Sequence, residues 1–381
     1  MKKVVIGATA RTPVGKIGGA LSHLSAVEIG GLAVEGAISR AGGLQPDTIV
    51  LGNVLQGGNG QNPARQAAIH GGVPRDTTGL TINNVCLSSM SSIAHARRLI
   101  LTGEAKTVLV GGFESMSCAP VAKLSKFDKR PMYQGLPELV KNDGLWCSIA
   151  NVGMGEVSES ENLRLSISRV DQDRWSLRSH LAAKDSEKLR IEEMYIGKAP
   201  LAMVDEGIRL DTSIEKISAL LPAFVASGSI TAANSSQMSD AGAAGFVALE
   251  DVMKANGVSP MAEICGTAMV AGKNSSLHLM PSQAIKKLLE NHDLKTTDIG
   301  VWEINEAFAG VVLASIRDLG ISEDRVNTLG GAIAIGHPLA ASAFRIVMSL
   351  ISGMKASNHE YGIAAICGGG GQGKAILLRS V

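Results

Sequence analysis

Aromatic side chains are scarce in this chain: of 381 residues, six are Phe, three are Tyr and three are Trp. So few rings cannot supply a stacking platform for bases, which argues against a single-stranded nucleic-acid binder. An excess of one charge is also lacking, because 36 Lys and Arg residues face 35 Asp and Glu residues, for a net charge of +1. This balance argues against any role at nucleic acids or membrane surfaces that bulk charge would drive.

Cysteines are few and widely spaced, and they form no CxxC pair: Cys86, Cys118, Cys147, Cys265 and Cys367. This pattern argues against a disulfide framework or a structural zinc site and favours a reducing compartment. No uninterrupted apolar run approaches the roughly 18 residues that a membrane span needs. The short apolar start of the chain, which Arg11 interrupts, predicts a strand rather than a signal peptide. We therefore expect a soluble, cytoplasmic protein without a metal site.

Glycine and small aliphatic residues are abundant instead, with 44 Gly, 45% hydrophobic residues and a mean hydropathy of +0.18. These values are typical of an α/β protein whose parallel strands are buried on both faces. The length predicts two or three domains rather than one core.

Strands and helices alternate in the first 117 residues and again in the last third of the chain, which predicts a mostly parallel sheet covered on both faces. Ser25 and Glu28 form a capping-box pattern at the start of the first helix, predicted for 25–40. Residues 118–236 are more charged and irregular, with one clear helix predicted over 170–191. The predicted divisions are a first half (1–117), an inserted loop domain (118–237), a return to the first half (238–258) and a second half (259–381).

The two halves resemble each other. Cys86 precedes a small-residue helix, a strand at 107–110 and two glycines, while His337 precedes a helix at 340–354, a strand at 362–367 and more glycines. This similarity predicts a duplicated βαβ unit. The Cys86 and His337 loops should then face one site at the edge where open α/β sheets bind ligands.

Cys86 is a candidate nucleophile because a cysteine at a strand-to-helix turn lies where N–H groups and the helix dipole stabilise a thiolate. Cys367 ends a strand and precedes four glycines, whose N–H groups could point at an oxyanion. The GxGxxG match at Gly368–Gly373 is not interpreted as a dinucleotide loop, because a strand rather than a helix follows it. A lone cysteine is more often a small buried hydrophobe. His337 and Asn305 likewise have purely structural alternatives.

Five stretches together resemble one known family. They are Ala10-Arg11-Thr12-Pro13, Gly111 to Ser117 (GGFESMS), Asn305 to Ala309 (NEAFA), Gly330 to Pro338 (GGAIAIGHP) and Cys367 to Gly373. In number, order and spacing they resemble a thiolase of the acetyl-CoA acetyltransferase type along essentially the whole chain. The resemblance implies a duplicated five-layer αβαβα fold with an inserted loop domain.

The resemblance also implies the catalytic roles. Cys86 would take the acyl group as a thioester, and His337 would activate this cysteine. Asn305 would position a water beside that histidine in one oxyanion hole. Cys367 would act as acid and base on the α-carbon of the second substrate. The N–H groups of Cys86 and Gly369 would form a second oxyanion hole.

Substrate contacts follow from the same resemblance. Arg209, Phe224 and Ser236 would contact coenzyme A, while Met154 and Phe308 would line the acyl pocket. No cofactor or metal is implied, since the coenzyme A thioester is the substrate. The family forms homodimers or homotetramers, and either assembly is expected here.

Departures from the family pattern leave the acyl-chain preference open. Leu87 and Ser89 stand where the biosynthetic pattern has glycines, and Ala340 replaces a glycine after His337. Gly153 replaces a loop histidine, and Ser275-Ser276 replaces a methionine-glycine pair. Gly153 would open space in the pocket, whereas Leu87 would fill it.

Three alternatives are weighed against an acetoacetyl-CoA-forming enzyme. One is a 3-ketoacyl-CoA thiolase for longer chains, and another is a weakly active acyl-CoA-binding homologue. A ketosynthase that uses a carrier-protein substrate is disfavoured, since Cys367 stands where such an enzyme requires a histidine.

A basic segment containing Lys123, Lys126, Lys129 and Arg130 is interpreted as a solvated loop, with contact to phosphates or another subunit as the alternative.

Overall fold

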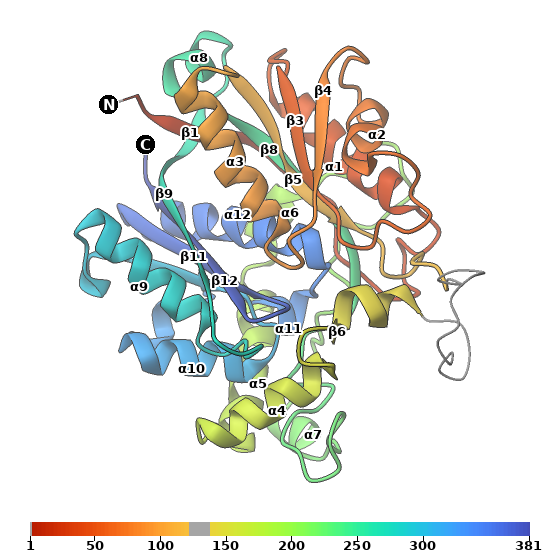
Figure 1. Ribbon diagram of the computed structural model, residues 1–381, viewed down its shortest axis with the longest axis vertical. Helices are drawn as coiled ribbons and strands as arrows, with labels where there is room; N and C mark the ends of the chain where they lie inside the picture. Colours follow the sequence, from red (N-terminus) through yellow and green to blue (C-terminus); the bar gives the residue numbers. More distant parts are fainter. Residues whose placement is uncertain (1, 122–137) are drawn as a thin grey trace.

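The strand order of the sheet repeats itself in the two halves of the chain. A computed structural model describes residues 2–121 and 138–381, so the basic segment at 123–130 lies outside the described residues. The first half contributes strands in the order β4-β3-β5-β8-β1, and the second half continues with β9, β12, β11 and β10 (Figure 1). The bounds are β1 (Val4–Arg11), β3 (Thr48–Gly52), β4 (Thr78–Ile82), β5 (Thr107–Glu114), β8 (Ser239–Leu249), β9 (Pro260–Ala271), β10 (Val301–Ile304), β11 (Tyr361–Gly368) and β12 (Gln372–Arg379).

Strand directions follow the same repeat. The pair β3 and β5 is parallel, as is the pair β10 and β11, while β8 and β12 each run antiparallel to their neighbours. An isolated bridge between Trp302 and Val326 occupies the place that β4 takes in the first half. The short β2 (Gly15–Lys16) pairs with β8. The predicted duplication is confirmed. The prediction of a mostly parallel sheet is wrong, because β1, β8, β9 and β12 all pair antiparallel with their neighbours in the middle of the strand order.

Helices cover both faces of this sheet and fill a central layer. Their bounds are α1 (Ala26–Arg40), α2 (Pro63–His70), α3 (Ser88–Thr102), α8 (Glu250–Ala255), α9 (Met280–His292), α10 (Ala309–Leu319), α11 (Ala332–Ile335), α12 (Leu339–Ser357) and the 3₁₀ turns η2 (Thr296–Asp298) and η3 (Glu323–Arg325). One apolar cluster joins α3 and α12 to strands of both halves, and two others lie under α1 with α2 and under α9 with α10. These clusters give the five αβαβα layers that the resemblance implies.

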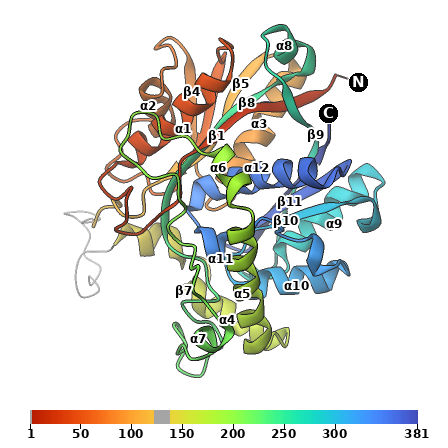
Figure 2. The same ribbon diagram turned by 180° about the vertical axis from the view of Figure 1, so that it is seen from behind.

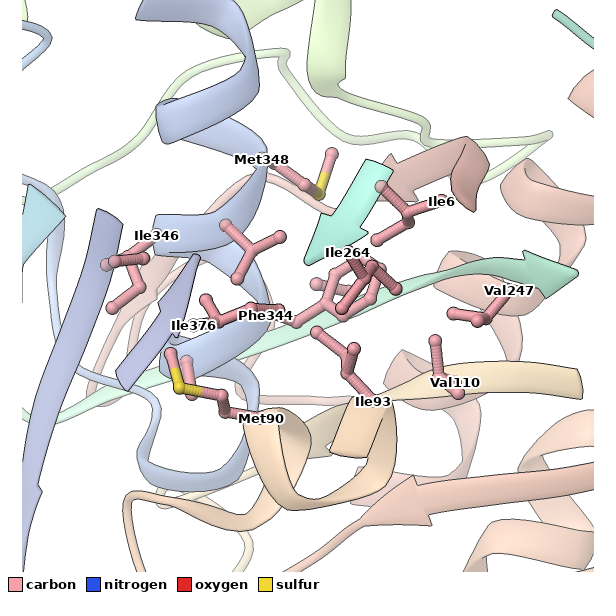
Figure 3. Packing of buried hydrophobic residues seen from close by; sticks show 14 of the residues in the cluster. Ile6, Met90, Ile93, Val110, Val247, Ile264, Phe344, Ile346, Met348 and Ile376 are labelled. Carbon is pink, nitrogen blue, oxygen red and sulfur yellow. The ribbon is translucent and has the colours of Figure 1, made fainter. Parts of the chain in front are cut away.

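The central layer is an apolar core built around the ring of Phe344 on α12. Figure 3 shows this ring among Ile6, Ile93, Val110 and Ile264, which come from β1, α3, β5 and β9. Phe344 is fully buried. Burying such a ring contributes roughly 1.5–3 kcal/mol to folding, so this packing fixes α3 and α12 side by side.

Of the inserted segment, α4, α5 and α7 lie in the lower part of the molecule in Figure 2, whereas α6 lies beside α12. Its described elements are η1 (Val140–Leu145), β6 (Trp146–Cys147), β7 (Val152–Gly153), α4 (Met154–Arg164), α5 (Arg169–Asp185), α6 (Glu187–Glu193) and α7 (Ile214–Ser218). Buried polar contacts attach it to the sheet: Arg11 bonds to Glu193 and to Asp205, both at 2.8 Å, and Glu306 accepts from Trp175 Nε1 at 3.0 Å.

Several local predictions are confirmed and others are wrong. The Ser25–Glu28 capping box is present, and a strand does follow the glycines after Cys367. The single helix predicted over 170–191 is instead α5 and α6, because the hydroxyl of Ser186 bonds to the carbonyl of Leu329 at 2.9 Å and the chain turns there. Strand β9 and helix α4 were not predicted.

One helix, α12, is long and apolar enough to cross a membrane by length and composition, but 83% of the relevant window is buried inside the molecule. Burial of this extent is typical of the core helix of a globular protein.

Candidate active site

Cys86 lies in a strained turn between β4 and α3. Val85, just before it, has a φ of 49°, which a β-branched residue adopts at a cost of about 1–3 kcal/mol. The turn is held by Asn83, whose Oδ1 accepts from Val85 N at 3.1 Å, and by Ser88, whose hydroxyl donates to the carbonyl of Val85 at 2.6 Å. These bonds fix Cys86 two residues before the start of α3.

A glycine turn lies against this thiol. Residues 369–371 connect β11 to β12, and Gly370 and Gly371 have φ values of 79° and 73°, which only glycine adopts readily. A Cβ on Gly371 would lie 2.0 Å from the carbonyl oxygen of Asn274. The turn therefore presents bare backbone, and the N–H of Gly369 faces the sulfur of Cys86.

The predicted nucleophile is a neutral thiol in this environment. Burial raises the pKa of Cys86 to about 12, although the N–H groups of Cys86 and Gly369 act in the opposite direction, and the nearby charge of Glu114 raises it further. Burial likewise lowers the pKa of His337 to about 3, with the charge of Arg345 adding to the effect. Desolvation therefore outweighs the helix terminus and the local N–H groups in setting the pKa of Cys86.

His337 is fixed by its backbone and by one ring nitrogen. Its N–H donates to the carbonyl of Gln237 at 2.9 Å, and its Nδ1 lies 2.6 Å from the hydroxyl of Ser342 on α12. Gly336 before it has a φ of 116°, and a Cβ there would lie 2.3 Å from the hydroxyl of Ser239. The other ring nitrogen, Nε2, is buried and forms no hydrogen bond within the described residues.

Asn305 follows β10 and lies beside the end of β11. Its N–H donates to the carbonyl of Ala365 at 2.9 Å, two residues before Cys367. Both side-chain atoms, Nδ2 and Oδ1, are buried and find no partner in the described part of the chain. Together with Nε2 of His337 they provide polar atoms that a substrate or a water can satisfy.

The two halves meet directly at this site. The hydroxyl of Ser89 accepts from the N–H of Phe344 at 2.8 Å, which joins the first turn of α3 to the second turn of α12. Cys367 is 1% exposed, and both burial and the neighbouring Cys86 raise the pKa of its thiol. The structure thus brings together Cys86, Gly369 and Cys367 and places the His337 and Asn305 loops at the same edge.

Four of the five predicted substrate contacts also gather here. The rings of Phe224 and Phe308 meet edge to face, with centroids 6.0 Å apart. Met154 and Phe308 share one buried cluster with Cys367, and the N–H of Ser236 donates to the carbonyl of Ala307 at 3.1 Å. The fifth, Arg209, is exposed, and its backbone N–H donates to Nδ1 of His180 at 3.2 Å.

The departures near Cys86 have structural roles. Leu87 is fully buried and packs on Gly368, where a Cβ would lie 2.8 Å from its Cγ, so its bulk belongs to the core. The N–H of Ala340 donates to Glu114 at 3.2 Å. A Cβ at position 153 would first meet the flexible end of Glu156, whose Oε2 would lie 2.3 Å away.

Two residues near the site were not predicted. Glu114 accepts from Asn53 Nδ2 and from the N–H groups of Val54 and Leu55 as well as Ala340, so it ties the nucleophile half to the His337 loop. The sequence signal that could have identified Glu114 is its position at the end of a strand predicted to be buried. Cys147, expected to be a packing residue, lies 3.1 Å from the hydroxyl of Ser275.

The donors around Cys147 distinguish it from Cys86. Although burial acts to raise it, the pKa of Cys147 is held below its ordinary value by Ser275 and by the N–H groups of Ala150, Ile149 and Gly370. Consecutive amides of the glycine turn therefore face two different thiols.

These pKa directions predict the pH dependence of alkylation. Because the pKa of Cys86 is raised to about 12, its thiolate fraction should increase about tenfold per pH unit from about pH 7 to about pH 9. The rate at which iodoacetamide labels the Cys86 peptide, followed by mass spectrometry, should increase in proportion, while Cys147 should already react at lower pH. A labelling rate of Cys86 that levels off below about pH 8 would instead indicate a preformed thiolate–imidazolium pair.

Comparisons with known proteins match the whole chain. The family model for the thiolase N-terminal domain matches residues 4–251, and that for the thiolase C-terminal domain matches residues 258–380. A probable acetyl-CoA acetyltransferase of Mycobacterium leprae is 38% identical over the full length of both chains. The acetyl-CoA acetyltransferase of Yarrowia lipolytica is 37% identical, covering 99% of this chain and 96% of that protein. The crystal structure of the Bacillus anthracis acetyl-CoA acetyltransferase superposes with a TM-score of 0.94 at 33% identity, covering 100% and 99% of the two chains.

Proposed function

Since this chain belongs to the thiolase family of acyltransferases, we propose that it is an acetyl-CoA C-acetyltransferase, which interconverts two acetyl-CoA with acetoacetyl-CoA and CoA. The observation that carries this proposal is the meeting of Cys86, Cys367 and the amide of Gly369 at one edge of the sheet. Relatives of this chain are named acetyl-CoA acetyltransferases, which supports the short-chain substrate.

In the first half of the proposed reaction, Cys86 becomes acetylated. Its proton passes to Nε2 of His337 as Sγ attacks the thioester carbonyl of the first acetyl-CoA, and the same proton then goes to the departing CoA sulfur. A buried neutral imidazole suits this exchange, because it can accept a proton only while the negative sulfur or oxyanion is present. Splitting the reaction in this way divides one difficult step into two easier ones.

In the second half, Cys367 gives its thiol proton to Nε2 of His337, and the resulting thiolate removes the α-proton of another acetyl-CoA. The carbanion attacks the acetyl carbonyl carbon, the new carbon–carbon bond forms, and the bond from that carbon to Cys86 Sγ breaks. The sulfur of Cys86 recovers the proton held by His337, while Cys367 keeps the α-proton, so both thiols and the neutral imidazole are restored. We assign the oxyanions of these steps to Asn305 with His337 and to the amides of Cys86 and Gly369, since fixed donors stabilise developing charge.

Longer 3-ketoacyl-CoA substrates are a second candidate, favoured by the absence of a side chain at Gly153 and the small Ser275 at the site.

We further propose a homodimer or homotetramer, since β4 is the last strand at one edge of the described sheet and its Leu80 is 46% exposed to solvent. All five cysteines, each among the described residues, are free thiols, which supports the proposed cytoplasmic location.

Thiolysis of purified protein tests this proposal. With CoA as acceptor, acetoacetyl-CoA should be cleaved with a higher kcat/KM than a medium-chain 3-ketoacyl-CoA. Preference for the medium chain would assign the protein to longer substrates. Cleavage of neither substrate, with CoA binding retained, would overturn the enzymatic proposal in favour of an acyl-CoA-binding protein.

A further inference from the structure

The carboxylate of Glu114 accepts hydrogen bonds from both halves of the chain. Glu114 is the last residue of β5 and is fully buried. Its Oε1 accepts from Asn53 Nδ2 at 2.9 Å and from the N–H of Leu55 at 3.0 Å. Its Oε2 accepts from the N–H groups of Val54 and Ala340, both at 3.2 Å. Four N–H donors therefore meet the acceptor positions of one ionised carboxylate.

Three of these donors lie in the turn after β3, which supports the Cys86 turn. The carbonyl of Val54 accepts from Asn83 Nδ2 at 3.3 Å, and Asn83 Oδ1 accepts from the N–H of Val85 at 3.1 Å. A chain of hydrogen bonds thus runs from Glu114 to the residue that precedes the predicted nucleophile.

The fourth donor, Ala340, belongs to the segment that carries His337. It is the second residue of α12 and follows His337 by three positions. The backbone of α12 lies directly on β5 here, since a Cβ on Gly112 would lie 2.4 Å from the carbonyl oxygen of Ala340. The carboxylate of Glu114 therefore joins the His337 loop to the Cys86 turn.

This junction requires the ionised form of the carboxylate. All four partners are N–H donors, and a protonated carboxyl group presents a hydroxyl that donates a hydrogen bond itself. Among the described residues, no basic side chain is a hydrogen-bond partner of Glu114. Protonation would therefore weaken one pair of bonds, either those from Asn53 and Leu55 or those from Val54 and Ala340.

Glu114 can change its charge near neutral pH. Burial raises the pKa of Glu114 to about 7, although the N–H groups of Leu55, Ala340 and Val54 lower it, and the charge of Asp240 on β8 raises it further. A modest change of pH around this value therefore converts the carboxylate into the acid.

The groups that carry the proposed chemistry around this junction titrate far from neutral pH. Burial raises the pKa of Cys86 to about 12 and lowers that of His337 to about 3. Burial also raises the pKa of Asp240, whose carboxylate accepts from the N–H and the hydroxyl of Ser117. The turn after β3 and the first turn of α12 present no charged side chain.

We propose that Glu114 is a positioning residue for the thiolase reaction: its ionised carboxylate holds the His337 loop against the Cys86 turn, and protonation releases this hold. The inference rests on the proposed function at Cys86. Besides burial, the charge of Glu114 also raises the pKa of the Cys86 thiol and so acts against the thiolate. Ionised Glu114 therefore favours the reaction through the position of His337 and not by stabilising the thiolate.

The test is the pH dependence of kcat/KM for thiolysis of acetoacetyl-CoA, which reports titrating groups of the free enzyme. In the wild type, kcat/KM should decrease as the pH falls through about 7, and this decrease is the acid limb of the profile. In Glu114→Gln the amide nitrogen donates where a carboxylate oxygen accepts, so kcat/KM at about pH 8 should be about tenfold lower and the acid limb should be absent. Asp240→Asn removes a charge that raises the pKa of Glu114, so its acid limb should lie at lower pH.

Asp47→Asn is the matched control. Asp47 is an exposed carboxylate that accepts from the N–H groups of Lys106 and Thr107, at the opposite end of β5 from Glu114. Its pH profile should equal that of the wild type. Circular dichroism at each pH establishes that all four proteins are folded where kcat/KM is measured.

An acid limb in Glu114→Gln equal to that of the wild type would overturn the role of Glu114, as would a limb that disappears only in Asp240→Asn. If Glu114→Gln does not fold, the comparison of the wild type with Asp240→Asn decides, and an unshifted limb overturns the inference. Cleavage of acetoacetyl-CoA by the wild type without an acid limb near pH 7 would refute this inference alone. No cleavage at any pH would mean that the proposed reaction itself is wrong.

Discussion

Replacing Cys86 with alanine should lower kcat for thiolysis of acetoacetyl-CoA by at least about 10⁴-fold, because the variant lacks the atom to which the acyl group is transferred. The amides of Cys86 and Gly369 and the aromatic contact of Phe224 with Phe308 remain, so CoA binding should change little. Steady-state thiolysis and calorimetric CoA binding measure the two effects separately.

The matched control is Cys118→Ala, which removes a thiol that is exposed and lies outside the site. Its activity should equal that of the wild type. Activity of Cys86→Ala within tenfold of the wild type would show that another group carries the acyl chain.

Replacing Cys367 with alanine should separate the two halves of the reaction. Condensation and thiolysis should fall about 10²–10⁴-fold, since proton transfer by a positioned group contributes this much. Acetyl transfer to Cys86 should persist, because it requires His337 and not Cys367. The raised pKa of the Cys367 thiol means that its resting form carries the proton, which suits protonation of the enolate when acetoacetyl-CoA is cleaved.

Exchange of labelled CoA into acetyl-CoA reports the first half alone and should stay near the wild-type rate in Cys367→Ala. Cys265→Ala, a half-buried thiol on β9, is the control and should leave both halves intact. Loss of the exchange reaction together with thiolysis in Cys367→Ala would mean that the two cysteines do not have separate roles.

Local sequence signals predicted much of the fold because the two halves use them regularly. The capping box at Ser25, the strand-to-helix turn at Cys86 and the repeated helix–strand–glycine pattern all appear in the structure. Strand β9 was missed, since Glu263, Gly266 and Thr267 interrupt its apolar residues and no clear alternation of apolar and polar residues is left in the sequence. The break between α5 and α6 depends on the contact of Ser186 with Leu329, which lies 143 residues away and leaves no local trace.

The residues of the candidate site could be predicted from the sequence, but the pKa values of its thiols could not. Sequence position suggested a stabilised thiolate at Cys86, whereas burial, a property of the folded core, raises its pKa to about 12. Cys147 was interpreted as a packing residue because nothing near it in sequence suggests otherwise. Its donors include Ser275 and Gly370, which only the fold brings to it.

The most direct test of the central claim is to identify the residue that carries the acyl group. Protein incubated with acetyl-CoA is quenched in acid, digested and examined by mass spectrometry. We expect one acetyl group on the Cys86 peptide in the wild type, the same label in Cys367→Ala, and no label in Cys86→Ala. An acetyl group on Cys147 or Cys367 of the wild type with Cys86 unmodified would show that Cys86 is not the acyl carrier.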